Sequence, residues 1–205
     1  MIETATAPTG TTTPPPRGRA RWKWTWEQFR KLDEQGFFAG RRVELIRGEI
    51  VEMSPINWPH QLAKTKLARE LGAAFAGLAW INEQGPLPAA GSAPQPDVAV
   101  IAGRPEDYTD HPRTALLVVE VASSTLADDM TEKAELYATA SIAEYWVLDL
   151  NARQLHVYRD PQITSGLPDD LRATAYRTHQ TLSETDSVTP LAAPNSAVRV
   201  ADLLP

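Results

Sequence analysis

DVAVI at Asp97–Ile101 and ALLVVEV at Ala115–Val121 are the two stretches that decide the fold of this chain. Nearly continuous apolar runs of this length are typical of strands that are buried on both faces of a sheet. Each run contains one carboxylate: Asp97 opens the first, and Glu120 lies near the end of the second. Because a buried carboxylate is unfavourable unless it is paired or bound to a cation, these two residues are the first candidates for a functional site.

On neighbouring strands of one sheet, the carboxylates of Asp97 and Glu120 would converge on a hard cation such as Mg²⁺, which prefers carboxylate oxygens and water. The alternative is structural: Asp97 caps a turn after Pro96, and Glu120 pairs with an arginine. The spacing of the residues does not separate these two interpretations. A structure with the two carboxylates on opposite faces, or far apart, would exclude a shared metal site.

Helices and further strands surround these two runs. Amphipathic periodicity and N-cap residues predict helices at about 25–35, 57–76 and 124–140. Alternating or apolar runs predict strands at about 43–46, 49–53, 79–82, 87–89, 97–101, 115–121, 145–149, 154–158, 173–177 and 197–200. This order predicts an α/β (α+β) fold, in which helices flank a central mixed β-sheet.

The composition is that of an ordinary globular protein, with 42% hydrophobic and 22% charged residues and no cysteine. Residues 1–20, rich in Thr, Pro and Ala, cannot bury enough apolar surface to become ordered, so we expect a disordered tail before one domain at 21–205. Residues 1–16 lack the basic and apolar regions of a secretion signal, and no apolar run reaches about 18 residues. We therefore expect a cytoplasmic protein without membrane contact.

The charge is distributed unevenly along the chain. The formal charge of −6 argues against a general nucleic-acid coat protein. Residues 17–69 hold 12 Lys and Arg against 6 Asp and Glu, and the rest of the chain holds 8 against 20, so the two parts carry +6 and −12. This division is compatible with a phosphate-facing surface beside a carboxylate-rich site, and equally with two solvated faces.

Six sequence features occur in an order that resembles a known family. They are RVELIRGEIVEMSP at 42–55, His60 at the start of a helix, QPDVAVI at 95–101, LLVVEVASST at 116–125, a DxxxK spacing that ends at Lys133, and EYWVLDL at 144–150. Together they resemble the Uma-type family of putative restriction endonucleases, within the PD-(D/E)xK superfamily, over about residues 25–160. The resemblance implies a restriction-endonuclease-like mixed sheet flanked by helices and a metal-dependent phosphodiester hydrolase.

The resemblance also implies roles for individual residues. Asp97 and Glu120 match the two acidic positions, which would hold Mg²⁺ or Mn²⁺ together with the backbone carbonyl of Val121. Ala122 stands two positions after Glu120, where the superfamily has its lysine. The family resemblance therefore points to Lys133, on the following helix, and we expect its ammonium within hydrogen-bonding reach of Glu120. The alternative is a solvated lysine that pairs with a neighbour on its own helix.

Four other polar residues have less decisive patterns. Glu44 fits the early acidic position that often completes the metal shell in the superfamily; the exposed face of an alternating strand is the alternative. We interpret His60 as a helix-surface residue without a ligand role, with phosphate contact as the alternative. Tyr137 either holds Lys133 by a hydrogen bond or packs. Glu144 is interpreted as a turn residue.

The three N-terminal tryptophans, Trp22, Trp24 and Trp26, have two interpretations. Aromatic rings of this kind stack on nucleic-acid bases. At spacings of two residues near a chain end, they more often dock on the body of the protein.

We expect a Mg²⁺- or Mn²⁺-dependent DNA endonuclease, in which Lys133 orients the attacking water or stabilises the transition state. Two alternatives stay open: a catalytically silent nucleic-acid- or protein-binding module of the same fold, and a structural dimer-forming protein whose carboxylates pair internally. A homodimer is also one expected state of the nuclease, because many nucleases of this fold pair up to cut two strands.

Overall fold

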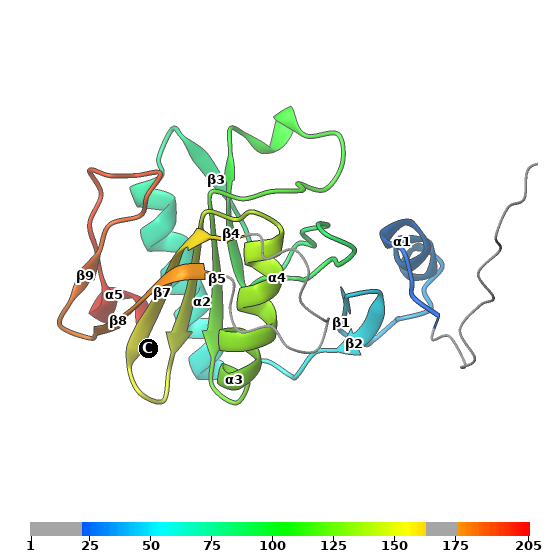
Figure 1. The fold of residues 1–205 in the computed structure, drawn as a ribbon, viewed down its shortest axis with the longest axis horizontal. Coiled ribbons are helices and arrows are strands. Elements are labelled where there is room, and N and C mark those ends of the chain that lie inside the picture. The colour runs from blue at the N-terminus through cyan, green and yellow to red at the C-terminus, as the bar shows by residue number, and fades with distance from the viewer. Residues whose placement is uncertain (1–21, 163–175) are drawn as a thin grey trace, which may run out of the picture.

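The computed structural model describes residues 22–162 and 176–205, and the predicted disordered tail at 1–20 lies outside them (Figure 1). A six-stranded sheet forms the centre. In spatial order its strands are β3 (Ala79–Asn82), β4 (Val98–Ala102), β5 (Leu117–Ala122), β6 (Glu144–Asp149), β7 (Gln154–Pro161) and β8 (Tyr176–Ser183). Only the β5–β6 pair is parallel among the neighbours in this sheet, so the sheet is mixed, as predicted.

A helical segment makes the parallel crossover between β5 and β6, since parallel neighbours need a long connection. It consists of α3 (Leu126–Asp128), the π-helical turn η2 (Asp129–Lys133) and α4 (Ala134–Thr139). Single π-helical turns inside α-helices are frequent at functional sites. This one contains Lys133.

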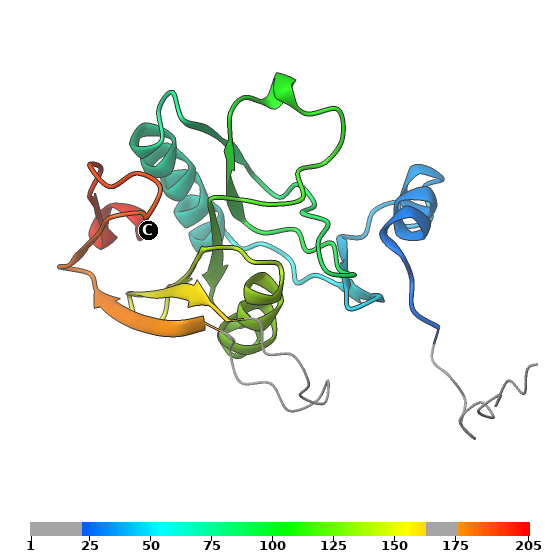
Figure 2. The ribbon, with the colours of Figure 1, turned by 45° about the horizontal axis from the view of Figure 1, so that its top comes forward.

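The sheet lies between two helical layers (Figure 2). Val98 and Val100 of β4 pack in one core cluster with α2 (Trp58–Ala74), whereas Ala99 and Ile101 pack in a second cluster with α4. Successive side chains of a strand point to opposite faces, so a strand covered on both faces is apolar at every position. This is the physical reason for the continuous apolar runs in the sequence.

The N-terminal elements lie beside the sheet, at the right of Figure 1. They are α1 (Trp26–Glu34) and a hairpin of β1 (Val43–Ile46) and β2 (Glu49–Glu52). The hairpin turns at Arg47 and Gly48, whose φ angles are both positive, 49° and 77°, as the tight two-residue turns of hairpins require. A bridge between Leu45 and Ala93 attaches β1 to the loop before β4.

The C-terminal elements pack against α2. They are β9 (Ser187–Val188), β10 (Val198–Arg199) and α5 (Val200–Leu203). A short 3₁₀ helix, η1 (Pro105–Asp107), lies between β4 and β5. No helix in the described ranges is both long and apolar enough to span a bilayer.

Three strand predictions need correction. Residues 87–89 form only an isolated bridge between Ala89 and Ser92, because Pro88 lacks the N–H that a strand ladder needs. The strand predicted at 197–200 is divided between β10 and α5. The strand predicted at 173–177 begins at Tyr176 among the described residues and continues to Ser183, while residues 173–175 lie outside them.

Candidate functional site

Asp97 and Glu120 lie side by side at one end of the sheet. β4 and β5 pair antiparallel with Val98 opposite Val119, which brings the two acidic residues next to each other. The N–H of Asp97 donates to Oε2 of Glu120 at 3.3 Å, and the N–H of Val121 donates to Oδ2 of Asp97 at 2.8 Å. Both side chains are buried. The predicted convergence of the two carboxylates is confirmed.

Lys133 reaches this pair from the helical layer. Its ammonium lies 3.0 Å from Oε1 of Glu120 and 3.5 Å from Oε1 of Glu44, and its side chain is only 14% exposed. The predicted contact with Glu120 is confirmed, and the alternative of a solvated lysine is wrong. The hydroxyl of Tyr137 donates to the same Oε1 at 2.7 Å, so Tyr137 holds Glu120 rather than Lys133.

Glu44 is buried rather than exposed on an alternating strand. All four residues of β1 are buried, because the loop that bridges to Leu45 through Ala93 covers the second face of the strand. Oε2 of Glu44 accepts the N–H of Gln95 from the segment just before β4, at 3.1 Å. Glu44 therefore joins Asp97, Glu120 and Lys133, as the sequence pattern allowed.

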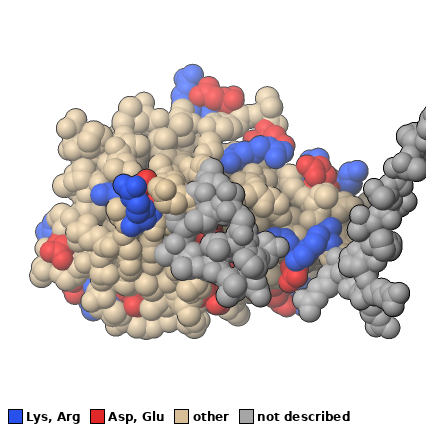
Figure 3. Space-filling model, viewed as in Figure 1, with Lys and Arg blue, Asp and Glu red and all other residues tan. Residues whose placement is uncertain are grey.

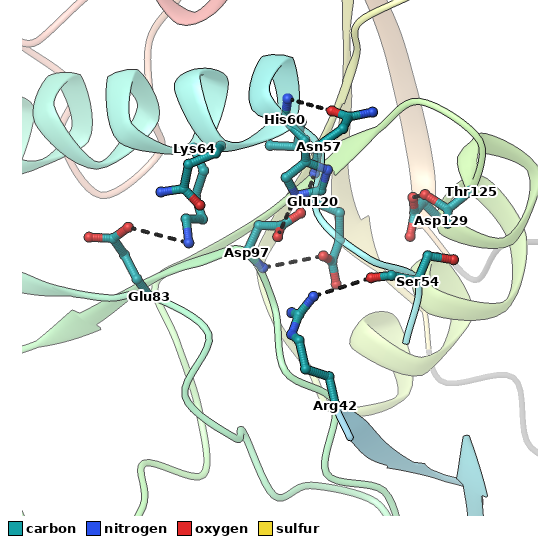
Figure 4. A network of polar contacts seen from close by, with 12 residues as sticks. Arg42, Ser54, Asn57, His60, Lys64, Glu83, Asp97, Glu120, Thr125 and Asp129 are labelled. Atoms are coloured by element: carbon teal, nitrogen blue, oxygen red, sulfur yellow. Dashed lines mark hydrogen bonds and ion pairs between the residues drawn. The ribbon is translucent and has the colours of Figure 1, made fainter. Parts of the chain in front are cut away.

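His60 is in the site, and its interpretation as a helix-surface residue is wrong. Its Nε2 lies 2.8 Å from Oδ1 of Asp97, and its side chain is 16% exposed. Asn57 caps α2 by accepting the N–H of His60, which places the imidazole in the first turn of the helix (Figure 4). One turn later, Lys64 is also buried, with Nζ 4.0 Å from Oε2 of Glu83.

Asp129, the acidic residue of the DxxxK spacing, was not among the predicted site residues. It is buried in the π-helical turn, and the hydroxyl of Thr125 donates to its Oδ2 at 2.6 Å. The carboxylates of Glu44, Asp97, Glu120 and Asp129, called the acidic cluster below, line one cleft of about 210 Å³ with Lys133 and His60.

Glu144 does not lie near this cleft, and its interpretation as a turn residue is wrong. It is fully buried in the first position of β6. The guanidinium of Arg159 donates to its Oε1 at 2.6 Å, and the N–H of Leu191 donates to its Oε2 at 2.7 Å. Glu144 and Arg159 therefore form a structural ion pair between β6 and β7.

Burial and crowding determine the protonation of the acidic cluster. Burial raises the pKa of Glu120 to about 8, although Lys133 acts to lower it. Burial also raises the pKa of Asp129 to about 6. Burial alone would lower the pKa of Lys133, but the charges of Glu120, Glu44 and Asp129 outweigh it and raise that pKa. The lysine is therefore charged, and the negative groups outnumber the positive ones, which favours binding of a further cation.

The donor set suits a hydrated divalent ion. Within residues 22–162 and 176–205, no three His, Asp or Glu side chains converge closely enough to hold a metal by themselves. Mg²⁺ keeps several of its waters and is usually bound through one or two carboxylates. The adjacent carboxylates of Asp97 and Glu120 fit that kind of binding.

The sequence model of the Uma2 family, described as "Putative restriction endonuclease", matches residues 26–200. The chain belongs to the Uma2 family. The matched range contains the whole acidic cluster, His60 and Lys133. No curated protein matches the chain.

This Uma2 protein is also similar to a solved structure, the crystal structure of a putative nuclease belonging to DUF820 from Anabaena variabilis ATCC 29413. The TM-score is 0.65 at 16% sequence identity, and the similarity covers 87% of this chain and 96% of that chain. At this identity the likeness shows the fold, which is the nuclease-like fold predicted from the sequence.

Proposed function

We propose that this Uma2 protein is a divalent-metal-dependent endonuclease that hydrolyses phosphodiester bonds of DNA. The observation that carries the proposal is the ammonium of Lys133 at 3.0 Å from Glu120, inside a cleft that the acidic cluster lines. A buried lysine beside adjacent carboxylates on two strands supplies the two things that phosphoryl transfer needs: a site for a cation and a fixed positive charge.

Asp97, Glu120 and the carbonyl of Val121 would hold Mg²⁺ or Mn²⁺. When bound, such an ion polarises a phosphoryl oxygen and lowers the pKa of a bound water. The remaining residues of the site keep these donors in place. His60 fixes one carboxylate oxygen of Asp97, and the N–H of Val121 fixes the other. Tyr137 fixes Glu120 from the helical layer.

Lys133 would contact the phosphate. Its ammonium is held by Glu120 and Glu44 and stays charged over the physiological pH range, because its pKa is raised. During hydrolysis, negative charge grows on the non-bridging phosphoryl oxygens, and a preorganised positive charge stabilises it. The ammonium also has the donors to orient the attacking water.

The proposal is tested by incubating supercoiled plasmid and circular single-stranded DNA with the protein and Mg²⁺ or Mn²⁺. We expect nicked and linear products from the wild type and none from Asp97→Ala. Asp33→Ala, which removes an exposed carboxylate on α1, is the matched control and keeps activity. A silent binding module would retain DNA without cutting it, and a structural protein would do neither.

A further inference from the structure

Most Lys and Arg side chains of residues 17–69 form ion pairs rather than an open cationic surface. Nine of them lie among the described residues, and six have a carboxylate within 4.0 Å. The six are Lys23, Arg30, Arg41, Arg47, Lys64 and Arg69. Figure 3 shows acidic and basic groups side by side on the face in view. A phosphate has to compete with such a carboxylate, so it binds more readily to a cation without one.

The three other cations of this stretch have no carboxylate within that distance in the part of the chain that the structure describes. They are Lys31, Arg42 and Lys66. Lys31 is exposed on α1, and the ammonium of Lys66 donates to the backbone carbonyl of Leu204. Of the three, only Arg42, which directly precedes β1, lines the cleft.

The guanidinium of Arg42 is anchored at one point. Its Nη1 donates to the backbone carbonyl of Ser54 at 3.3 Å, which is the one hydrogen bond of this side chain within residues 22–162 and 176–205. In Figure 4 the side chain extends from the start of β1 toward Ser54 and the site carboxylates. A guanidinium carries several N–H donors in a planar fork and is always charged. Because Arg42 is partly exposed and lines the cleft, its other donors can reach a ligand there.

The charge of the cleft lining differs between its segments. The helical segment after β5 contributes three carboxylates, those of Asp128, Asp129 and Glu132. The segment from β2 to the first turn of α2, residues 51–60, contributes one, that of Glu52. Arg41 donates to both oxygens of Glu52, at 3.2 and 2.7 Å, so the charge of Glu52 is compensated. Arg42, bound to this segment through Ser54, therefore adds a positive charge that no carboxylate of the segment neutralises.

The N-terminus of α2 lies on the same side of the cleft. Asn57, its N-cap, and His60 both line the cleft, and the first turn of this 17-residue helix contains no acidic residue. The N-terminus of a helix carries a partial positive charge. The helix end and Arg42 together make this side of the cleft the more favourable one for an anion.

Lys133, the other cation of the lining, has less freedom to bind a phosphate. Its ammonium lies 3.0 Å from Glu120 and 3.5 Å from Glu44, which occupy part of its donors. A guanidinium, in contrast, can donate parallel hydrogen bonds to both non-bridging oxygens of a phosphodiester. Arg42 supplies the donors that Lys133 uses for the carboxylates.

We propose that Arg42 binds the non-bridging oxygens of the phosphodiester in the cleft, from the side of residues 51–60, while Lys133 approaches it from the helical layer. This inference rests on the proposed function and assigns a substrate-binding residue to it. A fixed charge that holds the phosphate acts before and during hydrolysis alike. Its loss therefore raises KM more than it lowers kcat.

The test measures binding of a labelled DNA oligonucleotide to the full chain by fluorescence anisotropy, with Ca²⁺, which also takes oxygen ligands. Arg42→Gln keeps a donor for the Ser54 carbonyl and removes the charge. We expect it to weaken binding roughly tenfold, as expected for the loss of a hydrogen bond to a charged group. The decrease of affinity with salt becomes shallower, because fewer counterions are released. Arg42→Lys keeps the salt dependence and recovers only part of the affinity, since an ammonium lacks the planar fork.

The matched control is Arg104→Gln, which removes an exposed guanidinium beside η1, outside the lining of the cleft, and changes neither quantity. Two further measurements separate a phosphate contact from a structural role. In cleavage with Mn²⁺, Arg42→Gln raises KM by about the same factor and changes kcat less. Its Mn²⁺ affinity, measured by calorimetry, equals or exceeds that of the wild type, because a cation has been removed from the cleft.

Three results would overturn the inference: wild-type affinity and salt dependence in Arg42→Gln, a lower Mn²⁺ affinity in this variant, or no DNA binding by the wild type. Failure of the proposed function gives a different result. If the wild type cuts plasmid and Arg42→Gln binds and cuts equally well, the function is retained and the inference is lost. If the wild type binds DNA through Arg42 but cuts none, the inference is retained and the function is lost.

Discussion

The ammonium of Lys133 lies 3.0 Å from Oε1 of Glu120, although the two residues are thirteen positions apart in the chain. The superfamily pattern would place this lysine at position 122, on the same face of β5 as Glu120, since side chains two residues apart share a face. Ala122 lies there instead, packed in the same cluster as Tyr137 and Leu136 of α4. Because the side chain of Ala122 is small, the helical segment packs directly on this face of β5. Lys133, which belongs to that segment, therefore reaches Glu120 from the helical layer.

Removing this ammonium separates metal binding from cleavage. We expect Lys133→Ala to lower the rate of plasmid cleavage on the order of 10²–10³-fold, since one preorganised charge at the transition state contributes about that much. Mn²⁺ affinity, measured by calorimetry, stays unchanged or rises, because a cation has left the neighbourhood of the metal. Lys133→Arg does not restore the rate fully, because a planar guanidinium does not replace a compact ammonium in a crowded site.

The matched control for this prediction is Lys31→Ala, an exposed lysine of α1. If Lys133→Ala cleaves plasmid as fast as Lys31→Ala, Lys133 is not the catalytic cation.

His60 is expected to position Asp97 for the metal. Partners that hydrogen-bond to a metal ligand typically change metal affinity by about 10- to 100-fold. We therefore expect His60→Ala to weaken Mn²⁺ binding by roughly this factor, with partial recovery in His60→Gln, which keeps a donor. His179→Ala, on the distant strand β8, leaves the affinity unchanged. Equal Mn²⁺ affinity in His60→Ala and the wild type would mean that the Asp97 carboxylate needs no support from α2.

Local patterns were sufficient to predict most of the elements. Thr25 and Asn57, the predicted N-caps of α1 and α2, each accept the N–H three residues later. The apolar runs became β4 and β5 because helices cover both faces of the sheet. At 87–89 the apolar pattern failed, because a proline there removes a ladder hydrogen bond.

The burial of charged side chains was harder to predict, because their partners are distant in sequence. Glu44 is buried by a loop that follows it by some fifty residues, and its contact with Gln95 spans 51 positions. For His60 a signal was present in the sequence. It continues the spacing of the buried residues Lys64, Leu67 and Leu71 by one turn, so it belongs to the face of α2 that packs inward.

Glu144 provides a prediction about stability rather than activity. Its carboxylate is fully buried and accepts hydrogen bonds from Arg159, Trp146 and Leu191. Glu144→Ala leaves these donors without an acceptor, and breaking a buried ion pair from one side costs about 3–5 kcal/mol. Urea denaturation measures the loss. Glu184→Ala breaks the exposed pair with Arg153 and serves as the control, with a far smaller effect. Comparable losses in both variants would contradict the structural role of Glu144.

Metal binding is expected to release a proton. Burial raises the pKa of Glu120, with further contributions from Asp97, Asp129 and Glu44, so this carboxyl takes up a proton at a higher pH than an ordinary glutamate does. A metal ligand must be deprotonated, and the proton therefore competes with the cation below that pH. The apparent Mn²⁺ affinity should rise from about pH 6 to about pH 8, by at most about tenfold per pH unit for one proton, and then level off.

Calorimetry in two buffers of different ionisation enthalpy counts the protons released, and Asp129→Asn tests the cause. Asp129 contributes to the raised pKa of Glu120, so its neutralisation lowers that pKa and moves the midpoint of the affinity profile to lower pH. Asp33→Asn, on the exposed face of α1, leaves the midpoint in place. A Mn²⁺ affinity that does not change between about pH 6 and about pH 8 would show that Glu120 is already ionised or is not a ligand. If Glu120 is not a ligand, Asp97 alone among the proposed carboxylate ligands would hold the ion, and Glu120 would serve to anchor Lys133.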